Sequence, residues 1–188
     1  MSKFQSDYAP TEKRRVDAHR ATLRLATAAM FVAMSVVIGM FCKTFLNFSG
    51  GLIRITFENL PVILSGIFFG PLVGGLVGAV ADLVSYLLSP QIYPPNLIVT
   101  LGAFLVGVVS GLVAKYAIRT HGVKQIAVAG AAAHLVGSMI VKSIGLYQFY
   151  QWGILLRIPL YLVIASLEIG LLCVLWKQTS FRRLLEKL

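Results

Sequence analysis

The feature that most constrains this chain is a series of apolar stretches, most of which approach the length of a membrane-spanning helix. A helix needs about 20 mostly apolar residues to cross the roughly 30 Å hydrocarbon core of a bilayer. The predicted spans are 25–41, 59–70, 72–88, 97–114, 126–145 and 155–176. The chain is 57% hydrophobic and 13% charged, which excludes a soluble enzyme or a disordered protein, since globular domains have about 25% charged residues. We predict an all-α integral membrane protein with six transmembrane helices.

The second predicted span is too short to cross a bilayer by itself. A helix over residues 59–70 would rise only about 18 Å. Either it begins earlier, near Leu52, or neighbouring protein supports it. Residues 52–57 alternate apolar and polar side chains, which indicates a strand or an extended loop. We therefore expect a lid-like loop between the first two helices.

The distribution of positive charge predicts the orientation, because cytoplasmic segments carry an excess of Lys and Arg. With the N-terminus inside, 13 of the 17 Lys and Arg fall on the cytoplasmic side. The remaining four, Lys43, Arg54, Lys142 and Arg157, fall in the outer half. We predict one transmembrane domain over 1–188, with a basic cytoplasmic segment at 1–21 and a cytoplasmic tail at 177–188. Basic cytoplasmic loops explain the net charge of +10 without a nucleic-acid partner.

Ionised side chains inside membrane spans are costly and mark functional sites. In the outer half they are predicted to gather at one depth, where four cations face two acids, Glu58 and Asp82. This excess of positive charge favours an anionic ligand. A carboxylate can also accept two parallel hydrogen bonds from an amidine-like edge, and aromatic side chains can stack on a flat ring. The cluster therefore predicts a ligand with a planar heterocycle and a carboxylated tail.

The candidate ligand-binding residues are Arg54, Glu58, Asn59, Asp82, Tyr93, Asn96, Lys142, Tyr147, Arg157 and Tyr161. An ordinary interfacial belt is the alternative for each tyrosine. Snorkelling to the headgroups is the alternative for each cation.

Two further patterns concern helix packing and buried polar groups. His134 and Glu168 share a depth in the fifth and sixth spans, so we predict that they hydrogen-bond to each other, as a structural pair or as a proton relay. Ala29 and Ala33 form an Ala-x-x-x-Ala pattern, which either packs within the bundle or docks a partner helix. The sequence shows no phosphate-binding loop, no metal-ligand spacing and no nucleophile–base set. We therefore expect no enzyme activity, no metal and no cofactor.

Residues 55–71, with the sequence ITFENLPVILSGIFFGP, resemble the substrate-binding S-components of energy-coupling factor (ECF) transporters. Together with the Gly-rich third span and Asp82, they are most similar to the folate-specific S-components. The resemblance implies a high-affinity, multi-pass receptor in a bacterial cell membrane that takes folate from outside. It also implies that a transmembrane scaffold subunit and two ATPases join this chain and use ATP on its behalf.

The resemblance also implies residue roles. Ala29 and Ala33 would contact the scaffold subunit. The ligand contacts would come from Asp82 or Glu58 on the pterin edge, Asn59 or Asn96 beside them, Tyr93, Tyr147 and Tyr161 on the rings, and Arg54, Lys142 and Arg157 on the glutamate carboxylates. The alternatives are an S-component for riboflavin, biotin or pantothenate, and a small membrane enzyme or channel.

Overall fold

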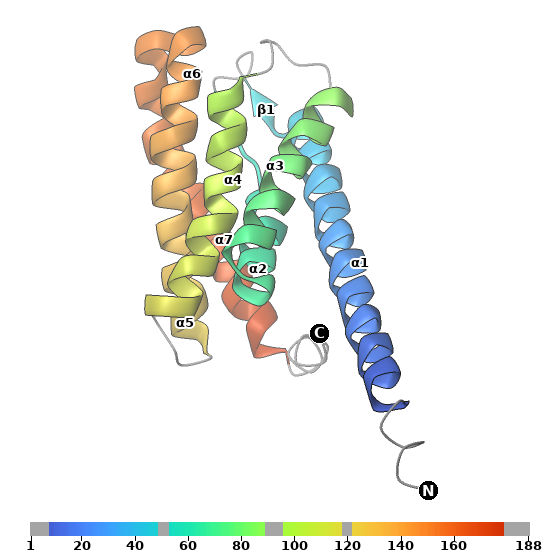
Figure 1. The fold of residues 1–188 in the computed structure, drawn as a ribbon. Helices are drawn as coiled ribbons and strands as arrows, with labels where there is room; N and C mark the ends of the chain where they lie inside the picture. Colours follow the sequence, from blue (N-terminus) through green and yellow to red (C-terminus); the bar gives the residue numbers. More distant parts are fainter. Residues whose placement is uncertain (1–7, 49–52, 89–95, 118–121, 179–188) are drawn as a thin grey trace, which may run out of the picture.

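The structure, a computed structural model, describes residues 8–48, 53–88, 96–117 and 122–178, which form a helical bundle (Figure 1). The helices are α1 (Tyr8–Phe45), α2 (Asn59–Phe69), α3 (Pro71–Leu88), α4 (Leu97–Leu112), α5 (Val123–Ala133), α6 (Lys142–Tyr150) and α7 (Arg157–Lys177). The π-helical segment η2 (Val113–Ala117) extends α4, η3 (His134–Val141) joins α5 to α6, and the 3-10 helix η4 (Gln151–Leu156) leads into α7. The predicted all-α class is confirmed.

Five helices are long and apolar enough to cross a membrane within the described part of the chain. They are 17–45, 71–88, 97–117, 123–155 and 157–177. They coincide with five of the six predicted spans, and the sixth is the short apolar helix α2. The structure decides between the two explanations for α2: it begins at Asn59, not near Leu52, and its residues from Asn59 to Gly66 are all buried by neighbouring helices.

The segment before α2 contains the predicted extended structure. Strand β1 (Asn47–Phe48) pairs antiparallel with β2 (Ile53–Arg54). The backbone N–H of Ile55 also donates to the carbonyl of Leu46 at 3.1 Å. The loop between α1 and α2 therefore returns as a hairpin over the end of the bundle where α1 and α3 end and α4 begins (Figure 1).

Glycines bring α3 and α4 into close contact. A Cβ added at Gly107 would lie 2.0 Å from the carbonyl oxygen of Gly74, and one added at Gly78 would lie 2.2 Å from that of Ala103. Such separations leave no room for a methyl group, so these glycines set the distance between the two helices. Small residues at helix interfaces permit this close packing in membrane proteins.

Helix α1 is longer than its predicted span, because it begins at Tyr8 and includes most of the basic segment. Its end near Phe45 packs beside α3, whereas its N-terminal half leans away from the bundle (Figure 1). The beginning of α1 and the end of α7 lie at the same end of the bundle, opposite the β1–β2 hairpin (Figure 1). This arrangement agrees with two termini on one side of a membrane, and the cytoplasmic side remains a prediction.

Candidate functional site

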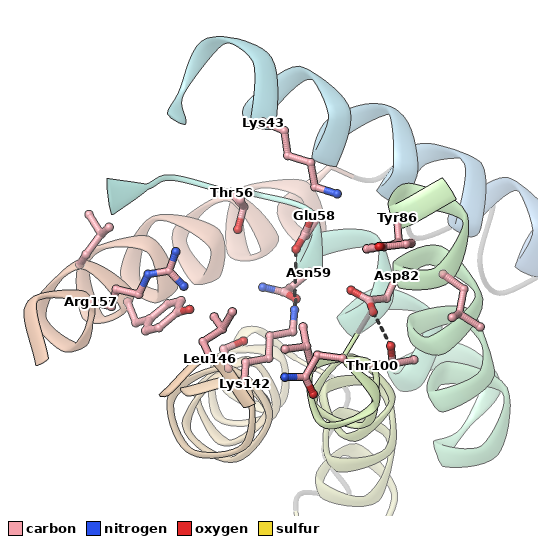
Figure 2. Close-up of a pocket in the computed structure, with 16 residues that line it drawn as sticks. Lys43, Thr56, Glu58, Asn59, Asp82, Tyr86, Thr100, Lys142, Leu146 and Arg157 are labelled. Atoms are coloured by element: carbon pink, nitrogen blue, oxygen red, sulfur yellow. Dashed lines mark hydrogen bonds and ion pairs between the residues drawn. The ribbon is translucent and has the colours of Figure 1, made fainter. Parts of the chain in front are cut away.

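A polar pocket lies at the hairpin end of the bundle, where six elements contribute side chains to one hollow of about 70 Å³ (Figure 2). Its lining comes from the second halves of α1 and α3, the segment entering α2, the first turn of α4, the junction of η3 with α6, and the first turn of α7. The lining residues are Lys43, Thr56, Glu58, Asn59, Asp82, Leu83, Tyr86, Asn96, Val99, Thr100, Ser138, Lys142, Leu146, Arg157, Leu160 and Tyr161.

Lys142 lies at the centre of a cluster of polar side chains inside the bundle. Its Nζ donates to Asn59 Oδ1 at 3.2 Å and lies 3.7 Å from Glu58 Oε1. All three side chains point toward one another in Figure 2, and Lys142 and Asn59 are 7% and 6% exposed. The carbonyl of Glu58 accepts a hydrogen bond from Ser35 Oγ at 2.6 Å, which fixes the entry of α2 against α1. A cation buried this deeply requires such partners, because desolvation of an unpaired charge is costly.

Asp82 faces the pocket from α3. Its Oδ2 accepts a hydrogen bond from the hydroxyl of Thr100 on α4 at 2.7 Å, and Tyr86 lies one turn further along the same face (Figure 2). On the α1 side, Lys43 Nζ donates to Ser85 Oγ at 2.6 Å. Asp82 therefore faces α4 and the interior of the bundle.

Arg157 and Tyr161 approach the pocket from the first turn of α7. The Arg157 guanidinium lies 4.6 Å from the centre of the Tyr150 ring, within cation–π range. Arg157 is 6% exposed. It therefore does not snorkel to the headgroups, which was the alternative for this residue.

Asn96 lines the pocket, but its amide is used by the fold. Its Oδ1 accepts from the backbone N–H of Ile98 at 2.9 Å and so caps α4, while its Nδ2 donates to the carbonyl of Gly145 at 2.6 Å. Asn59 is therefore better placed than Asn96 to supply an amide to a ligand.

The structure thus brings seven of the ten candidate residues to one hollow. These are Glu58, Asn59, Asp82, Asn96, Lys142, Arg157 and Tyr161. Tyr147 is 48% exposed, and it is not among the described residues that line the hollow. Its position on α6 leaves about half of the side chain exposed, so a contact between Tyr147 and a ligand stays a prediction. Tyr93 and the side chain of Arg54 lie outside the described part of the structure.

Sequence reasoning missed several pocket residues. Thr56, Thr100 and Ser138 carry no charge and have no distinctive spacing, so they gave no signal. Ser138 is 2% exposed, and its Oγ has no hydrogen-bond partner among the described residues. The periodicity could have revealed it, because Ser138 precedes Lys142 by one helical turn. Lys43 was expected in the outer half but was given no role.

The charge of the pocket suits an anionic ligand, but its volume is too small for a ligand the size of a vitamin. Three cations, Lys43, Lys142 and Arg157, outnumber the two carboxylates of Glu58 and Asp82, so the described lining has an excess of one positive charge. The hollow of about 70 Å³ is well below the roughly 300–1,000 Å³ of pockets for drug-sized ligands. The lining residues are bonded to each other, so a vitamin-sized ligand requires the pocket to widen and these bonds to be exchanged.

The second predicted polar pair is confirmed. His134 Nε2 on η3 lies 2.6 Å from Glu168 Oε2 on α7. The two residues are 3% and 0% exposed. His134 precedes Ser138 by four residues and so lies deeper in the bundle than the pocket. The contact ties α7 to the α5–η3–α6 helix, and nothing in the described lining connects it to a ligand.

Five membrane-length helices, a buried short helix and a polar pocket with an excess of positive charge define a multi-pass membrane protein with a small-molecule site. A family profile described as "ECF transporter, substrate-specific component" matches residues 23–181. The chain belongs to this family of substrate-specific components of ECF transporters.

Individual relatives agree with this assignment. The chain is 32% identical to the folate transporter FolT of Clostridium novyi (strain NT) over 91 residues, which are 48% of this chain and 52% of that protein. It is 28% identical to an uncharacterized protein of Mycoplasma pneumoniae over 134 residues, which are 70% of this chain and 27% of that protein. The chain thus spans about half the length of the first relative and about a quarter of the second.

The fold has a solved counterpart. A crystal structure of FolT bound with folic acid superposes with a TM-score of 0.63 at 24% identity, covering 82% of this chain and 93% of that one. At this level of identity the match confirms the fold.

Proposed function

We propose that this chain is the folate receptor of an ECF transporter. Three observations support the proposal. The chain belongs to the substrate-specific family, the relative from Clostridium novyi is named a folate transporter, and the fold matches a protein crystallised with folic acid. The observation on which it most depends is the pocket itself, where an excess of cations surrounds two carboxylates. This composition suits a dianionic tail joined to a ring with an amidine-like edge.

The geometry favours particular roles within the pocket. Asp82 takes the 2-amino-4-oxo edge of the pterin, because a carboxylate can accept two parallel hydrogen bonds and Thr100 already orients it. Lys142 and Arg157 neutralise the glutamate carboxylates. Tyr161 packs against a ring. Of the remaining candidates, Glu58, Asn59, Arg54 and Tyr93 supply further contacts, and Asn96 positions α4.

Ligand entry requires the internal bonds of the pocket to open. Because the hollow of about 70 Å³ is too small for folate, Lys142 must exchange its contacts with Glu58 and Asn59 for contacts with ligand. The segment from the β1–β2 hairpin to the first residue of α2 carries these two partners. It is therefore the element that moves, in the manner of a lid.

Energy comes from partner subunits in this proposal. A transmembrane scaffold and two ATPases join the chain in the membrane, and the ATPases hydrolyse ATP. Ala29 and Ala33 are both exposed on α1, so they are accessible to a scaffold helix. Ala33→Trp is expected to leave folate binding unchanged and to abolish uptake in cells that contain the full transporter. Loss of binding would show instead that Ala33 packs within the bundle.

Calorimetric titration of the purified chain with folic acid tests the ligand assignment. Tryptophan fluorescence is a poor reporter, since Trp152 is 74% exposed and lies outside the described pocket lining. Asp82→Asn and Arg157→Ala should each weaken binding by about 1–3 kcal/mol, as for the loss of a charged hydrogen bond. Asp17→Asn, at the other end of the bundle, is the matched control and should bind as the wild type does.

The same titration examines the alternative ligands. Saturable heat with riboflavin, biotin or pantothenate, and none with folic acid, would show that the ligand is another flat or anionic vitamin. The assignment to the family would still stand. Wild-type affinity for folic acid in both Asp82→Asn and Arg157→Ala would remove these two residues from the site.

A further inference from the structure

A second and much larger cavity lies between α1 and α3, away from the polar pocket. This α1–α3 groove has a volume of about 700 Å³. It is lined by Asp17, Arg20, Ala21, Arg24, Leu25, Ala28, Ala29, Val32, Phe69, Val73, Leu76, Val77 and Val80. Apart from the three charged residues, every member is apolar. None of these residues lines the proposed folate site.

The groove exists because α1 diverges from α3 toward its N-terminus (Figure 1). Near the hairpin, Lys43 Nζ bonds to Ser85 Oγ at 2.6 Å. A Cβ added at Gly39 would lie 2.7 Å from Glu58 Oε2, so α1 passes very close to its neighbours there. Toward its N-terminus, α1 leans away from the bundle (Figure 1). The space between the diverging helices is the groove.

The apolar part of the groove has the depth of one leaflet. Arg24 and Lys43 are 19 residues apart on α1, which is about 28 Å along a helix and close to the roughly 30 Å hydrocarbon thickness. They therefore mark the two membrane interfaces. The lining runs along α1 from Asp17 to Val32, about 22 Å, of which the apolar stretch beyond Arg24 takes about 12 Å; along α3 it runs from Val73 to Val80, about 10 Å. The charged end of the groove therefore lies at and beyond one interface, and its apolar part runs from that interface to near the middle of the bilayer.

The charged end of the groove suits an anionic headgroup. Arg20 and Arg24 are four residues apart and so lie on one face of α1. Guanidinium groups bind phosphate through paired hydrogen bonds. Asp17 at the same end leaves an excess of one positive charge, which favours an anionic over a zwitterionic lipid. Beyond these residues, exposed apolar side chains such as Leu76, which is 59% exposed, form the wall.

We propose that the α1–α3 groove binds one anionic phospholipid, with its phosphate on Arg20 and Arg24 and an acyl chain between α1 and α3. The depth of one leaflet, the apolar wall and the paired arginines at the interface all match this occupant. Ala29 borders both the groove and the proposed scaffold surface, so the test uses the chain without partner subunits.

Native mass spectrometry tests the proposal. The chain is reconstituted in vesicles of equal phosphatidylglycerol and phosphatidylcholine, extracted in mild detergent, and weighed with its retained lipid. The wild type should retain one phosphatidylglycerol in at least severalfold preference to phosphatidylcholine. Arg20→Gln with Arg24→Gln should lose this preference, and Leu76→Trp, which fills the groove, should lose the bound lipid.

The matched control removes two cations at the same end of the bundle but outside the groove. Lys115→Gln with Lys124→Gln should retain phosphatidylglycerol as the wild type does. No retained lipid in the wild type, or equal retention in the wild type and both groove variants, would overturn the proposal. A loss of phosphatidylglycerol in the control equal to that in the arginine variant would also overturn it, because general charge would then explain the binding. Folate binding is measured separately and does not enter these outcomes.

Discussion

Replacing Lys142 with methionine tests how the pocket is held together and how it binds an anion. Methionine retains an unbranched side chain of similar length, which matters because the Lys142 stem packs closely on α4: a Cβ added at Gly102 would lie 2.6 Å from Lys142 Cγ. The substitution therefore removes the charge and its hydrogen bond to Asn59 with little change in packing. Glu58, 3.7 Å from the ammonium group, loses its nearby cation.

The magnitude follows from the distance and the burial. Two unit charges 3.7 Å apart attract by about 4–5 kcal/mol at an effective dielectric constant of 20. Desolvation of both groups offsets much of this attraction, so we expect a net coupling of about 1–2 kcal/mol between Lys142 and Glu58. The loss of one charged hydrogen bond to ligand costs about 1.5–3 kcal/mol, roughly a 10- to 150-fold decrease in affinity for folic acid.

Thermal unfolding in detergent and calorimetric titration measure the two quantities. Lys142→Met, Glu58→Gln and the double variant form a cycle, in which the double variant should be destabilised less than the two single variants together. Lys115→Met, on the exposed η2 segment, is the control. Additive single effects, within about 0.5 kcal/mol as for independent sites, would show that Lys142 and Glu58 are not coupled. Wild-type affinity of Lys142→Met for folic acid would show that Lys142 does not contact the ligand.

Two further predictions concern the bundle. Gly107→Ala should destabilise the protein by about 1–3 kcal/mol, because its Cβ would lie 2.0 Å from the Gly74 carbonyl oxygen; an unchanged unfolding temperature would show that α3 and α4 can separate freely. Glu168→Ala should cost about 3–5 kcal/mol, whereas leucine at both His134 and Glu168 should restore most of that stability. If the double variant is as unstable as Glu168→Ala, the pair has a role that apolar packing cannot replace.

Hydropathy and residue size predicted most of the fold. Five spans and the short α2 lie where the apolar stretches indicated, because a bilayer requires apolar helices of fixed length. The length of α1 was not predictable in this way. Its basic first turns are polar, and hydropathy detects only the part of a helix that is inside the membrane.

The site was predicted from charge and depth, and the limits of both show in particular residues. Lys142, Asp82 and Arg157 were found because ionised groups in a membrane need partners or a role. Tyr147 was included because of its depth, but depth does not give the direction of a side chain around the helix axis. Ser138 and Thr100 were missed because hydroxyl groups are common inside membrane helices and carry no such signal.

The mass of the small molecule that co-purifies with this chain is the sharpest test of whether the chain binds folate. The chain is expressed in bacterial cells, extracted in mild detergent, washed and denatured, and the released molecule is weighed. We expect a folate, in amounts approaching one per chain, and a large decrease for Asp82→Asn. A different vitamin recovered in that amount, or a cation in place of an anion, would contradict this expectation.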